Sequence, residues 1–282
     1  MTVLLINPPY RISAPFHYDH YEQIDPPRNL AIIAAWLEQR NIEVEVLDTT
    51  VLEMSFDDIE REIRRRQPAI VGITNRSTST FPMVERTAQL VKQVNQATPV
   101  IVGGTYVSWM PLEAIKRCAD IDYLIVGEGD VQGPKLIQRL LDGQAVTDIT
   151  GIVYRDTKDP GKIHRTPPAA LIENLDDVPF PAYHLVPIEK YVERGERYIM
   201  SLTRGCIFHC EYCTSSFERG RVRSHGTDKL IKEIVWAYEQ GFRYFYFFDD
   251  ILTVDRKKAM ELCEAIVATG LKFNWHCLTR TE

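Results

Sequence analysis

The stretch Tyr198-Ile-Met-Ser-Leu-Thr-Arg-Gly-Cys206-Ile-Phe-His-Cys210-Glu-Tyr-Cys213 joins an apolar run to three cysteines spaced Cys-x₃-Cys-x₂-Cys. The run Tyr198–Thr203 predicts a buried strand, so the cysteines follow the carboxyl end of that strand. In a parallel barrel this end is the catalytic face. Three thiolates on one short loop can converge on one inorganic centre, and they leave one position open in a zinc site or a four-iron cluster.

Other interpretations of these cysteines remain open. A zinc site could take His209, Cys263 or Cys277 as its fourth ligand, although His209 is the immediate neighbour of Cys210 and adjacent residues rarely both ligate one tetrahedral ion. Three unrelated buried cysteines are the other alternative. The chain has six cysteines, and three of them lie within eight residues. In a reducing compartment such a cluster is more typical of metal binding or catalysis than of disulfides.

Strands and helices alternate on both sides of the cysteine loop. After the loop we expect helices over Thr227–Gln240 and Arg256–Thr269, and strands over Tyr244–Phe248, ending at Asp249-Asp250, and Lys272–Leu278, ending near Arg280. Before it we expect strands over Val3–Asn7, Glu43–Leu47, Ile70–Thr74, Pro99–Val102 and Tyr123–Val126, separated by helices. Apolar strands alternating with helices predict an α/β fold whose N-terminal part is a doubly wound, Rossmann-like or flavodoxin-like, five-stranded parallel sheet.

Ligands of doubly wound sheets bind at the carboxyl edge. The loops expected at this edge are Pro8–Tyr10, Thr74–Thr80, Gly103–Ser108 and Gly127–Asp130. Their small and hydroxyl residues would allow a large ligand to approach closely, although the glycines could also simply form tight turns.

A proline-rich segment, Thr147–Arg197, separates the two parts. Within it, Ile149–Tyr154 and Lys162–Arg165 could form a small hairpin around Asp159-Pro160-Gly161. We therefore expect a first domain over residues 1–145, a connector over 146–197 and a second domain over 198–282.

Composition narrows the function classes. The 282 residues suggest two domains, and 45% hydrophobic with 26% charged residues is an ordinary globular mixture. With 33 basic and 39 acidic residues the net charge is −6, which argues against nucleic acid as a main partner. No apolar run approaches the ~20 residues of a membrane span, and the N-terminus has no signal-peptide pattern, so a cytoplasmic location is expected.

The cysteine loop resembles the signature of radical S-adenosylmethionine (SAM) enzymes, and Thr203-Arg204-Gly205-Cys206 resembles the version found in their cobalamin-binding class. The resemblance implies that Cys206, Cys210 and Cys213 hold a 4Fe-4S cluster. Its unique iron would be chelated by SAM, whose cleavage gives a 5′-deoxyadenosyl radical. It also implies that Tyr212 contacts the adenine. A one-electron reductant such as flavodoxin or ferredoxin would pass an electron to the cluster.

The same resemblance extends to the strands after the loop, which look like the first half of a partial (β/α)6 barrel. Phe247-Phe248-Asp249-Asp250 matches the acidic end of its second strand, so Asp249 and Asp250 would face the cofactor or the substrate as catalytic groups. A solvated acidic turn is the alternative. Arg280 is a candidate ligand for the SAM carboxylate.

The N-terminal part resembles the cobalamin domain of that class over nearly its whole length. The residues implied to bind cobalamin are Pro8, Pro9, Thr74, Ser77, Gly103, Gly104, Gly127, Glu128 and Gly129. The loop Asn7-Pro8-Pro9-Tyr10-Arg11 lacks the Asp-x-His-x-x-Gly pattern of the cobalamin mutases. We therefore expect cobalamin without a protein histidine on cobalt, or a domain whose cobalamin site has lapsed.

The resemblance implies an enzyme that acts on a small molecule, most commonly by methyl transfer to an unactivated centre. A ring-forming reaction, as in anaerobic porphyrin-ester cyclases, is the alternative, and a non-catalytic cobalamin- or metal-binding module is a third. Only 85 residues follow Arg197, fewer than a partial barrel needs. The chain is therefore expected to be a fragment that folds its second part poorly and lacks turnover.

Overall fold

The computed structural model describes residues 1–9, 24–159, 161–211, 213 and 221–280. The chain forms two compact units. The first comprises Met1–His17, Asn29–Ala170 and Pro181–Val186, and the second comprises Tyr18–Arg28, Leu171–Phe180 and Pro187–Glu282. Each unit has its own sheet, and each is described separately below.

The sheet of the first unit confirms the predicted α/β class. Its parallel strands are β1 (Val3–Asn7), β2 (Val44–Asp48), β3 (Ile70–Asn75), β4 (Val100–Gly104) and β5 (Tyr123–Ile125). They are ordered β2-β1-β3-β4-β5, so the strand order reverses between β1 and β3. In flavodoxin-like sheets a ligand binds outside the carboxyl ends of the strands at this reversal.

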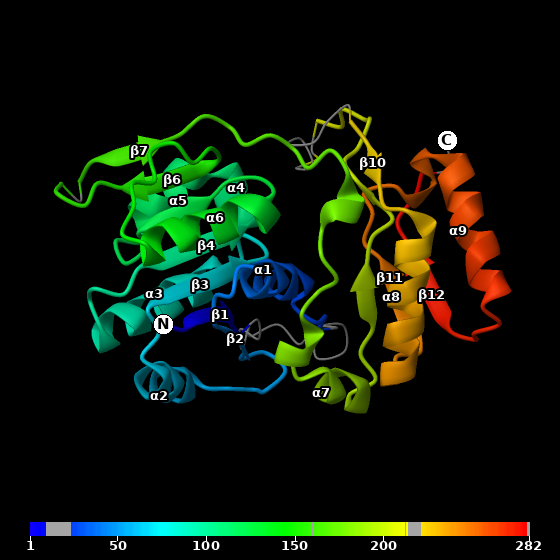
Figure 1. Cartoon of the computed structure of the whole chain (residues 1–282), viewed down its shortest axis with the longest axis horizontal. Helices are drawn as coiled ribbons and strands as arrows, with labels where there is room; N and C mark the ends of the chain where they lie inside the picture. The colour runs from blue at the N-terminus through cyan, green and yellow to red at the C-terminus, as the bar shows by residue number, and fades with distance from the viewer. Residues whose placement is uncertain (10–23, 160, 212, 214–220, 281–282) are drawn as a thin grey trace. The chain divides into compact units, whose positions relative to one another are not determined.

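Helices cover both faces of this sheet (Figure 1). One face carries α1 (Arg28–Glu38) and α6 (Gly129–Leu141), while the other carries α2 (Phe56–Arg66), α3 (Phe81–Val94), α4 (Thr105–Trp109) and α5 (Pro111–Arg117). Helix α2 shows how the sequence sets this arrangement. Ser55 and Asp58 form a capping box, and only Ile59 and Ile63 of the helix are buried, so a charged helix presents one apolar stripe to the sheet.

The sheet continues beyond the five predicted strands. The hairpin expected in the connector forms as β6 (Ile152–Arg155) and β7 (Ile163–Arg165), and β6 pairs antiparallel with β5. Arg155 anchors the hairpin, because its guanidinium donates to the carbonyl oxygens of Cys118 (3.0 Å) and Ile121 (3.1 Å) after α5. The first sheet therefore has seven strands among the described residues.

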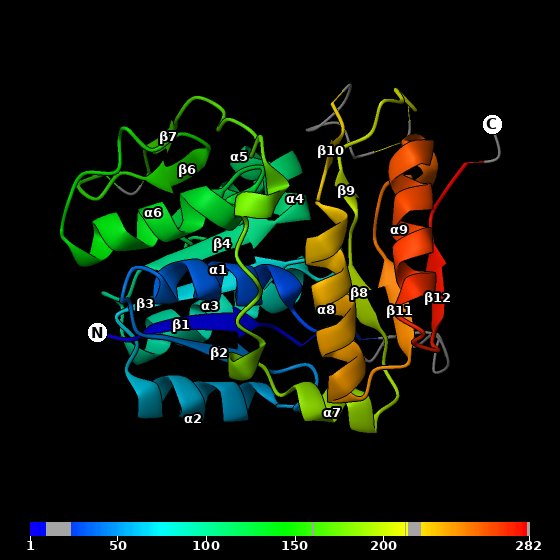
Figure 2. The same cartoon turned by 45° about the vertical axis from the view of Figure 1, so that its right-hand side comes forward.

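The second unit holds three parallel strands in the order β12-β11-β8 (Figure 2). They are β8 (Tyr198–Met200), β11 (Tyr244–Phe247) and β12 (Asn274–Cys277), with α8 (Thr227–Gln240) and α9 (Arg256–Ala268) between them in sequence. Tyr198, Phe245 and Phe247 are completely buried and form the aromatic core of this unit. The strand-helix alternation expected after the cysteine loop is thus confirmed.

Several short elements were not predicted. Helix α7 (Ile188–Glu193) forms in the proline-rich segment, and three-residue 3-10 helices lie at Leu175–Asp177, Tyr183–Leu185 and Leu252–Val254. The predicted strand Tyr198–Thr203 is interrupted. Its last residue belongs to β9 (Thr203–Arg204), which pairs antiparallel with β10 (Arg223–Ser224).

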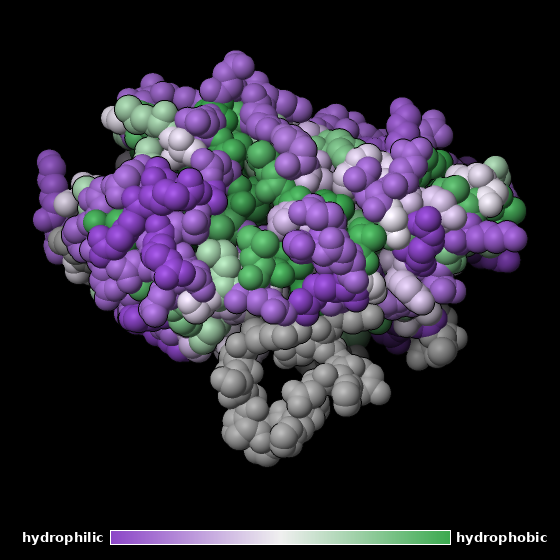
Figure 3. All heavy atoms as spheres, turned by 90° about the horizontal axis from the view of Figure 1, so that it is seen from below, coloured by the Kyte–Doolittle hydropathy of each residue, from purple (hydrophilic) through white to green (hydrophobic). Residues whose placement is uncertain are grey.

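Hydrophilic side chains predominate on the face shown in Figure 3, with hydrophobic ones in smaller patches between them. Among the described residues, no helix has both the length and the apolar character needed to cross a membrane.

Candidate functional site

The cysteine loop sits between the two strands of the β9–β10 hairpin. Cys206 is buried, whereas Cys210 and Cys213 are partly exposed, and all three are free thiols. The Cys213 amide donates to the Cys210 carbonyl oxygen at 3.1 Å, so the last two cysteines share a tight turn. Gly205 enters the loop with φ +99°, a conformation that favours glycine. Tyr212, the predicted adenine contact, lies outside the described residues.

The spacing of donor groups bears on which metal centre could fit. Within the described part of the chain, no three His, Cys, Asp or Glu side chains converge closely enough to hold a single metal ion. A four-iron cluster takes its thiolates on separate iron atoms, so its ligands surround the cluster rather than meet at one point. The donor set that the loop offers is three thiolates, which are soft ligands that iron–sulfur clusters take.

Arg280 lies beside this loop. Its guanidinium approaches the Cys210 Sγ at 3.7 Å and stacks over the Phe208 ring, 4.1 Å from the centroid. The structure thus brings a residue of the segment after β12 to the cysteine loop, as the sequence-based hypothesis requires. Its cation would favour a negative group bound there.

The adjacent aspartates Asp249 and Asp250 differ in their exposure to solvent. Asp250 is exposed. Asp249 is 1% exposed, and its carboxylate accepts hydrogen bonds from the Leu202 and Thr203 amides and the Thr203 hydroxyl. Burial raises the pKa of Asp249, although these three donors act in the opposite direction. The sequence suggested that both aspartates face the cofactor or the substrate; in the structure the Asp249 carboxylate binds the backbone amides of Leu202 and Thr203.

The carboxyl edge of the first sheet collects polar groups at the strand-order reversal. Asn7 is buried and donates to Asp48 Oδ1 at 2.8 Å, and the Thr50 hydroxyl donates to the Pro8 carbonyl oxygen at 2.9 Å. Pro9 follows at the end of the described segment. These contacts fix the start of the loop after β1, where two of the predicted cobalamin residues lie.

The neighbouring loop after β3 is held by its own side chains. The Thr74 hydroxyl accepts from Asn29 Nδ2 at 2.6 Å. Ser77 lies in a turn closed by Thr80, whose hydroxyl accepts from the Ser77 amide at 3.2 Å. Both predicted residues therefore belong to this edge, but the hydroxyl of Thr74 already has a protein partner.

Two adjacent glycines at the end of β4 differ in what surrounds them. At Gly103 an added Cβ would lie 3.8 Å from the nearest atom, in Ile125, which is an ordinary contact, so a Cβ fits there. At Gly104, φ is +120° and the added Cβ would lie 1.9 Å from the Asn75 carbonyl oxygen. Gly104 is therefore required by the backbone itself, independently of any ligand.

Residues after β5 complete the edge. Gly127 has φ +87°, with no atom within 4 Å of an added Cβ, and its amide donates to Ser108 Oγ at 3.0 Å. Glu128 is the N-cap residue of α6, and Gly129 is the first residue of that helix. The open space at Gly127 is what a large ligand at this edge needs.

Two buried acceptors at this end of the unit were missed by the sequence reasoning. Asn75 Oδ1, at the end of β3, and Gln132 Oε1, in the first turn of α6, have no hydrogen-bond partner among the described residues. Unsatisfied buried acceptors are rare in native proteins, and a bound ligand is one common explanation. For Asn75 the sequence contained a signal, because this amide residue directly follows the predicted strand Ile70–Thr74 at the edge where a ligand is expected. For Gln132 it contained none.

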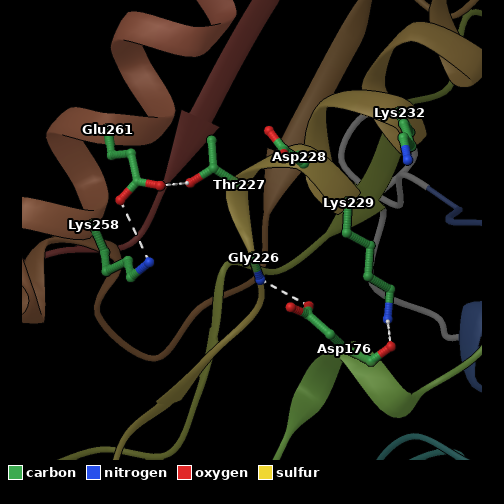
Figure 4. Close-up of a pocket in the computed structure, with 8 residues that line it drawn as sticks. All are labelled: Asp176, Gly226, Thr227, Asp228, Lys229, Lys232, Lys258 and Glu261. Carbon is green, nitrogen blue, oxygen red and sulfur yellow. Dashed lines mark hydrogen bonds and ion pairs between the residues drawn. The ribbon is translucent and has the colours of Figure 1, made fainter.

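A polar pocket of about 510 Å³ opens at the N-terminus of α8 (Figure 4). Three of its charged side chains bind backbone or hydroxyl groups. Asp176 accepts from the Gly226 amide at 2.8 Å, and Glu261 accepts from the Thr227 hydroxyl at 2.7 Å. Lys229 donates to the Leu175 carbonyl oxygen at 3.0 Å. None of the predicted site residues lines this pocket.

Comparisons with known proteins add independent information. Residues 19–136 match the family model of the B12 binding domain. An uncharacterized methyltransferase of Pyrococcus horikoshii is 33% identical over 260 residues, covering 91% of this chain and 56% of the relative. An anaerobic magnesium-protoporphyrin IX monomethyl ester cyclase of Rubrivivax gelatinosus is 28% identical, covering 99% of this chain and 50% of the relative. The chain thus spans about half the length of these curated relatives.

Solved structures show the same fold. The radical SAM methyltransferase TsrM from Kitasatospora setae, solved with its tryptophan substrate and a SAM analogue, matches 95% of this chain and 51% of its own, with a TM-score of 0.76 and 22% identity. The cobalamin-dependent SAM radical enzyme OxsB, solved with aqua-cobalamin and SAM, matches 97% of this chain and 38% of its own, with a TM-score of 0.77 and 17% identity.

Proposed function

We propose that this chain, which belongs to the cobalamin-binding radical SAM enzyme family, is part of an enzyme that transfers a methyl group to an unactivated centre of a small molecule. Residues 1–145 would form its cobalamin domain, and residues 198–282 the first strands of its radical SAM domain. The observation that carries the proposal is the three-cysteine loop at the carboxyl end of β8, with Arg280 beside it.

The donor set of the loop fits an iron–sulfur cluster. Three thiolates within eight residues are soft ligands, and they leave one iron without a protein ligand. Arg280 supports a role in holding the SAM carboxylate, because its guanidinium already lies against the Cys210 sulfur. Asp250 is exposed after β11, and we assign it to the amino group of SAM or to substrate. We assign Tyr212 to the adenine.

The edge of the first sheet fits cobalamin. Gly103 and Gly127 leave space where a large ligand can approach the backbone, and the buried Asn75 Oδ1 and Gln132 Oε1 are acceptors that suit the amide N–H groups of a corrin. The loop Asn7–Arg11 lacks the Asp-x-His-x-x-Gly pattern, so we expect cobalamin to bind without a protein histidine on cobalt from this position.

When bound, these groups supply the one-electron cleavage of SAM and the methyl group for transfer. The chain's own contribution is ligation by the cysteines, orientation of SAM by Arg280 and Asp250, and docking of cobalamin against small residues. A one-electron reductant such as a ferredoxin or flavodoxin would deliver the electron.

A ring-forming reaction is the second candidate. It is favoured by the cyclase of Rubrivivax gelatinosus, which aligns with 99% of this chain. The two reactions share their cofactors, so they differ in substrate and not in the groups described above.

Anaerobic reconstitution of the 282-residue chain with iron, sulfide and cobalamin tests the proposal. Wild-type protein should take up a cluster with visible charge-transfer absorption, whereas the variant with Cys206, Cys210 and Cys213 all changed to Ala should take up none. The Cys263→Ser variant is the matched control, because this cysteine lies in the same unit outside the loop, and it should behave as wild type. Iron and sulfide retained by the triple variant would refute the assignment. Bound zinc in place of iron and sulfide would favour a non-catalytic module.

A further inference from the structure

The carboxylate of Asp249 lies where the chain leaves the parallel sheet of the second unit. Pairing between β8 and β11 ends with the Phe248 amide, which donates to the Met200 carbonyl oxygen at 2.7 Å. Beyond that point the amides of Leu202 and Thr203 donate to Asp249 instead of to a strand, at 3.1 Å to Oδ2 and 2.5 Å to Oδ1. The Thr203 hydroxyl adds a third bond to Oδ1, at 2.6 Å.

Only a carboxylate satisfies this arrangement. The three donors converge on two oxygen atoms of a side chain that is 1% exposed, so water cannot take their place. An asparagine would accept at one atom and present its own N–H₂ group to the remaining amide. A buried amide left without an acceptor carries a substantial desolvation penalty.

The segment that Asp249 holds is also the base of the cysteine loop. Thr203 stands three residues before Cys206 and pairs with Ser224, where the chain returns from the loop. The His225 amide donates to the Leu202 carbonyl oxygen at 2.8 Å. Both ends of the loop are therefore attached to the two residues whose amides Asp249 binds.

We propose that Asp249 is a positioning residue that fixes the base of the cysteine loop and hence the place of Cys206. Of the two adjacent aspartates, only Asp250 then faces outward to meet a cofactor or substrate. This inference rests on the proposed function, because it takes the cysteine loop to be the cluster site. The inference assigns different roles to two aspartates that the sequence alone does not distinguish.

The test compares four variants of the 282-residue chain after anaerobic reconstitution: Asp249→Asn, Asp249→Ala, Thr203→Val and Asp250→Asn. The readouts are the rate at which a ferrous chelator removes iron and the electron paramagnetic resonance spectrum of the dithionite-reduced cluster. Asp249→Asn should release iron about tenfold faster than wild type, since it leaves one buried amide unpaired, and its spectrum should broaden because the first ligand is less well fixed. Asp249→Ala should lose the cluster during gel filtration.

Thr203→Val guards against a simple folding defect. It removes one of the three bonds with a side chain of similar shape, so it should fold, and its iron release should lie between those of wild type and Asp249→Asn. Asp250→Asn is the matched control and should release iron at the wild-type rate.

Wild-type rates and spectra in both Asp249→Asn and Thr203→Val would overturn the inference, and so would equally fast release from Asp250→Asn. If wild-type protein takes up no cluster, the proposed function fails and the inference fails with it. If wild type holds a cluster and the Asp249 variants hold it equally well, only the inference fails.

Discussion

Gly104→Ala and Gly103→Ala form a matched pair of substitutions one residue apart at the end of β4. Gly104 has φ +120° and ψ −171°, a region essentially restricted to glycine, and an alanine there is strained by about 1–3 kcal/mol. Its Cβ would also lie 1.9 Å from the Asn75 carbonyl oxygen, and forcing the two backbones apart adds about 1–3 kcal/mol. The expected loss for Gly104→Ala is therefore about 2–6 kcal/mol.

Gly103→Ala should cost almost nothing. The nearest atom to its Cβ is 3.8 Å away, an ordinary contact, and an alanine in a strand is less costly than glycine in chain entropy. Its unfolding free energy should stay within about 1 kcal/mol of wild type.

Urea unfolding of the 282-residue chain measures the difference, and amide hydrogen exchange of β3 and β4 peptides assigns it to the first unit. With slopes of about 1–3 kcal/mol per molar urea, Gly104→Ala should lower the unfolding midpoint of this unit by about 1–3 M. Gly103→Leu, in contrast, should leave the midpoint nearly unchanged and weaken cobalamin binding in equilibrium dialysis. Equal midpoints for the two alanine variants would refute the reasoning.

Three further predictions concern single side chains. His225 is buried, and its pKa falls to about 3, chiefly because burial disfavours the cation; the unfolded chain thus takes up the proton first as pH falls below 6.5. The contribution of neutral His225 to the free energy of unfolding should be complete above pH 6.5 and should decline toward pH 3. Between pH 7.5 and 5.0 the free energy of unfolding of wild type should therefore fall by about 2 kcal/mol more than that of His225→Gln, as measured by urea titration. Lys92→Met should lower the unfolding free energy by roughly 2 kcal/mol, because it removes a buried ammonium. This group donates to Asp122 at 2.7 Å and to the Thr98 carbonyl oxygen at 2.8 Å. An unchanged midpoint of thermal unfolding in calorimetry would contradict the prediction. Arg280→Gln should lower the reduction potential of a reconstituted cluster, measured by redox titration. The reason is that a cation 3.7 Å from Cys210 Sγ stabilises the reduced cluster, which carries more negative charge. A potential equal to that of wild type would contradict the prediction.

Local pattern was sufficient for the main strands and helices and for the fold class. Apolar runs of four to six residues alternating with amphipathic helices identify parallel strands, because buried strands need no polar face and their crossovers need helices. The Cys-x₃-Cys-x₂-Cys spacing after such a run likewise predicts a metal-binding loop, because ligand spacing within one loop is a property of the chain alone. Errors occurred where pairing partners lie far apart. Nothing near Ile152 shows that the β6–β7 hairpin extends the first sheet through β5.

The two aspartates after β11 mark the limit of what sequence determines here. Asp249 and Asp250 are chemically identical and adjacent, so composition and spacing assign both the same role. The amides of Leu202 and Thr203, 47 and 46 residues earlier in the chain, make Asp249 a buried backbone acceptor, whereas Asp250 is exposed. The two neighbouring glycines of β4 differ for the same reason, since a φ of +120° and the approach of the Asn75 carbonyl distinguish Gly104 from Gly103. Sequence determined which residue types stand at each strand end, and the tertiary structure decided which way each one faces, because that depends on groups brought close only by folding.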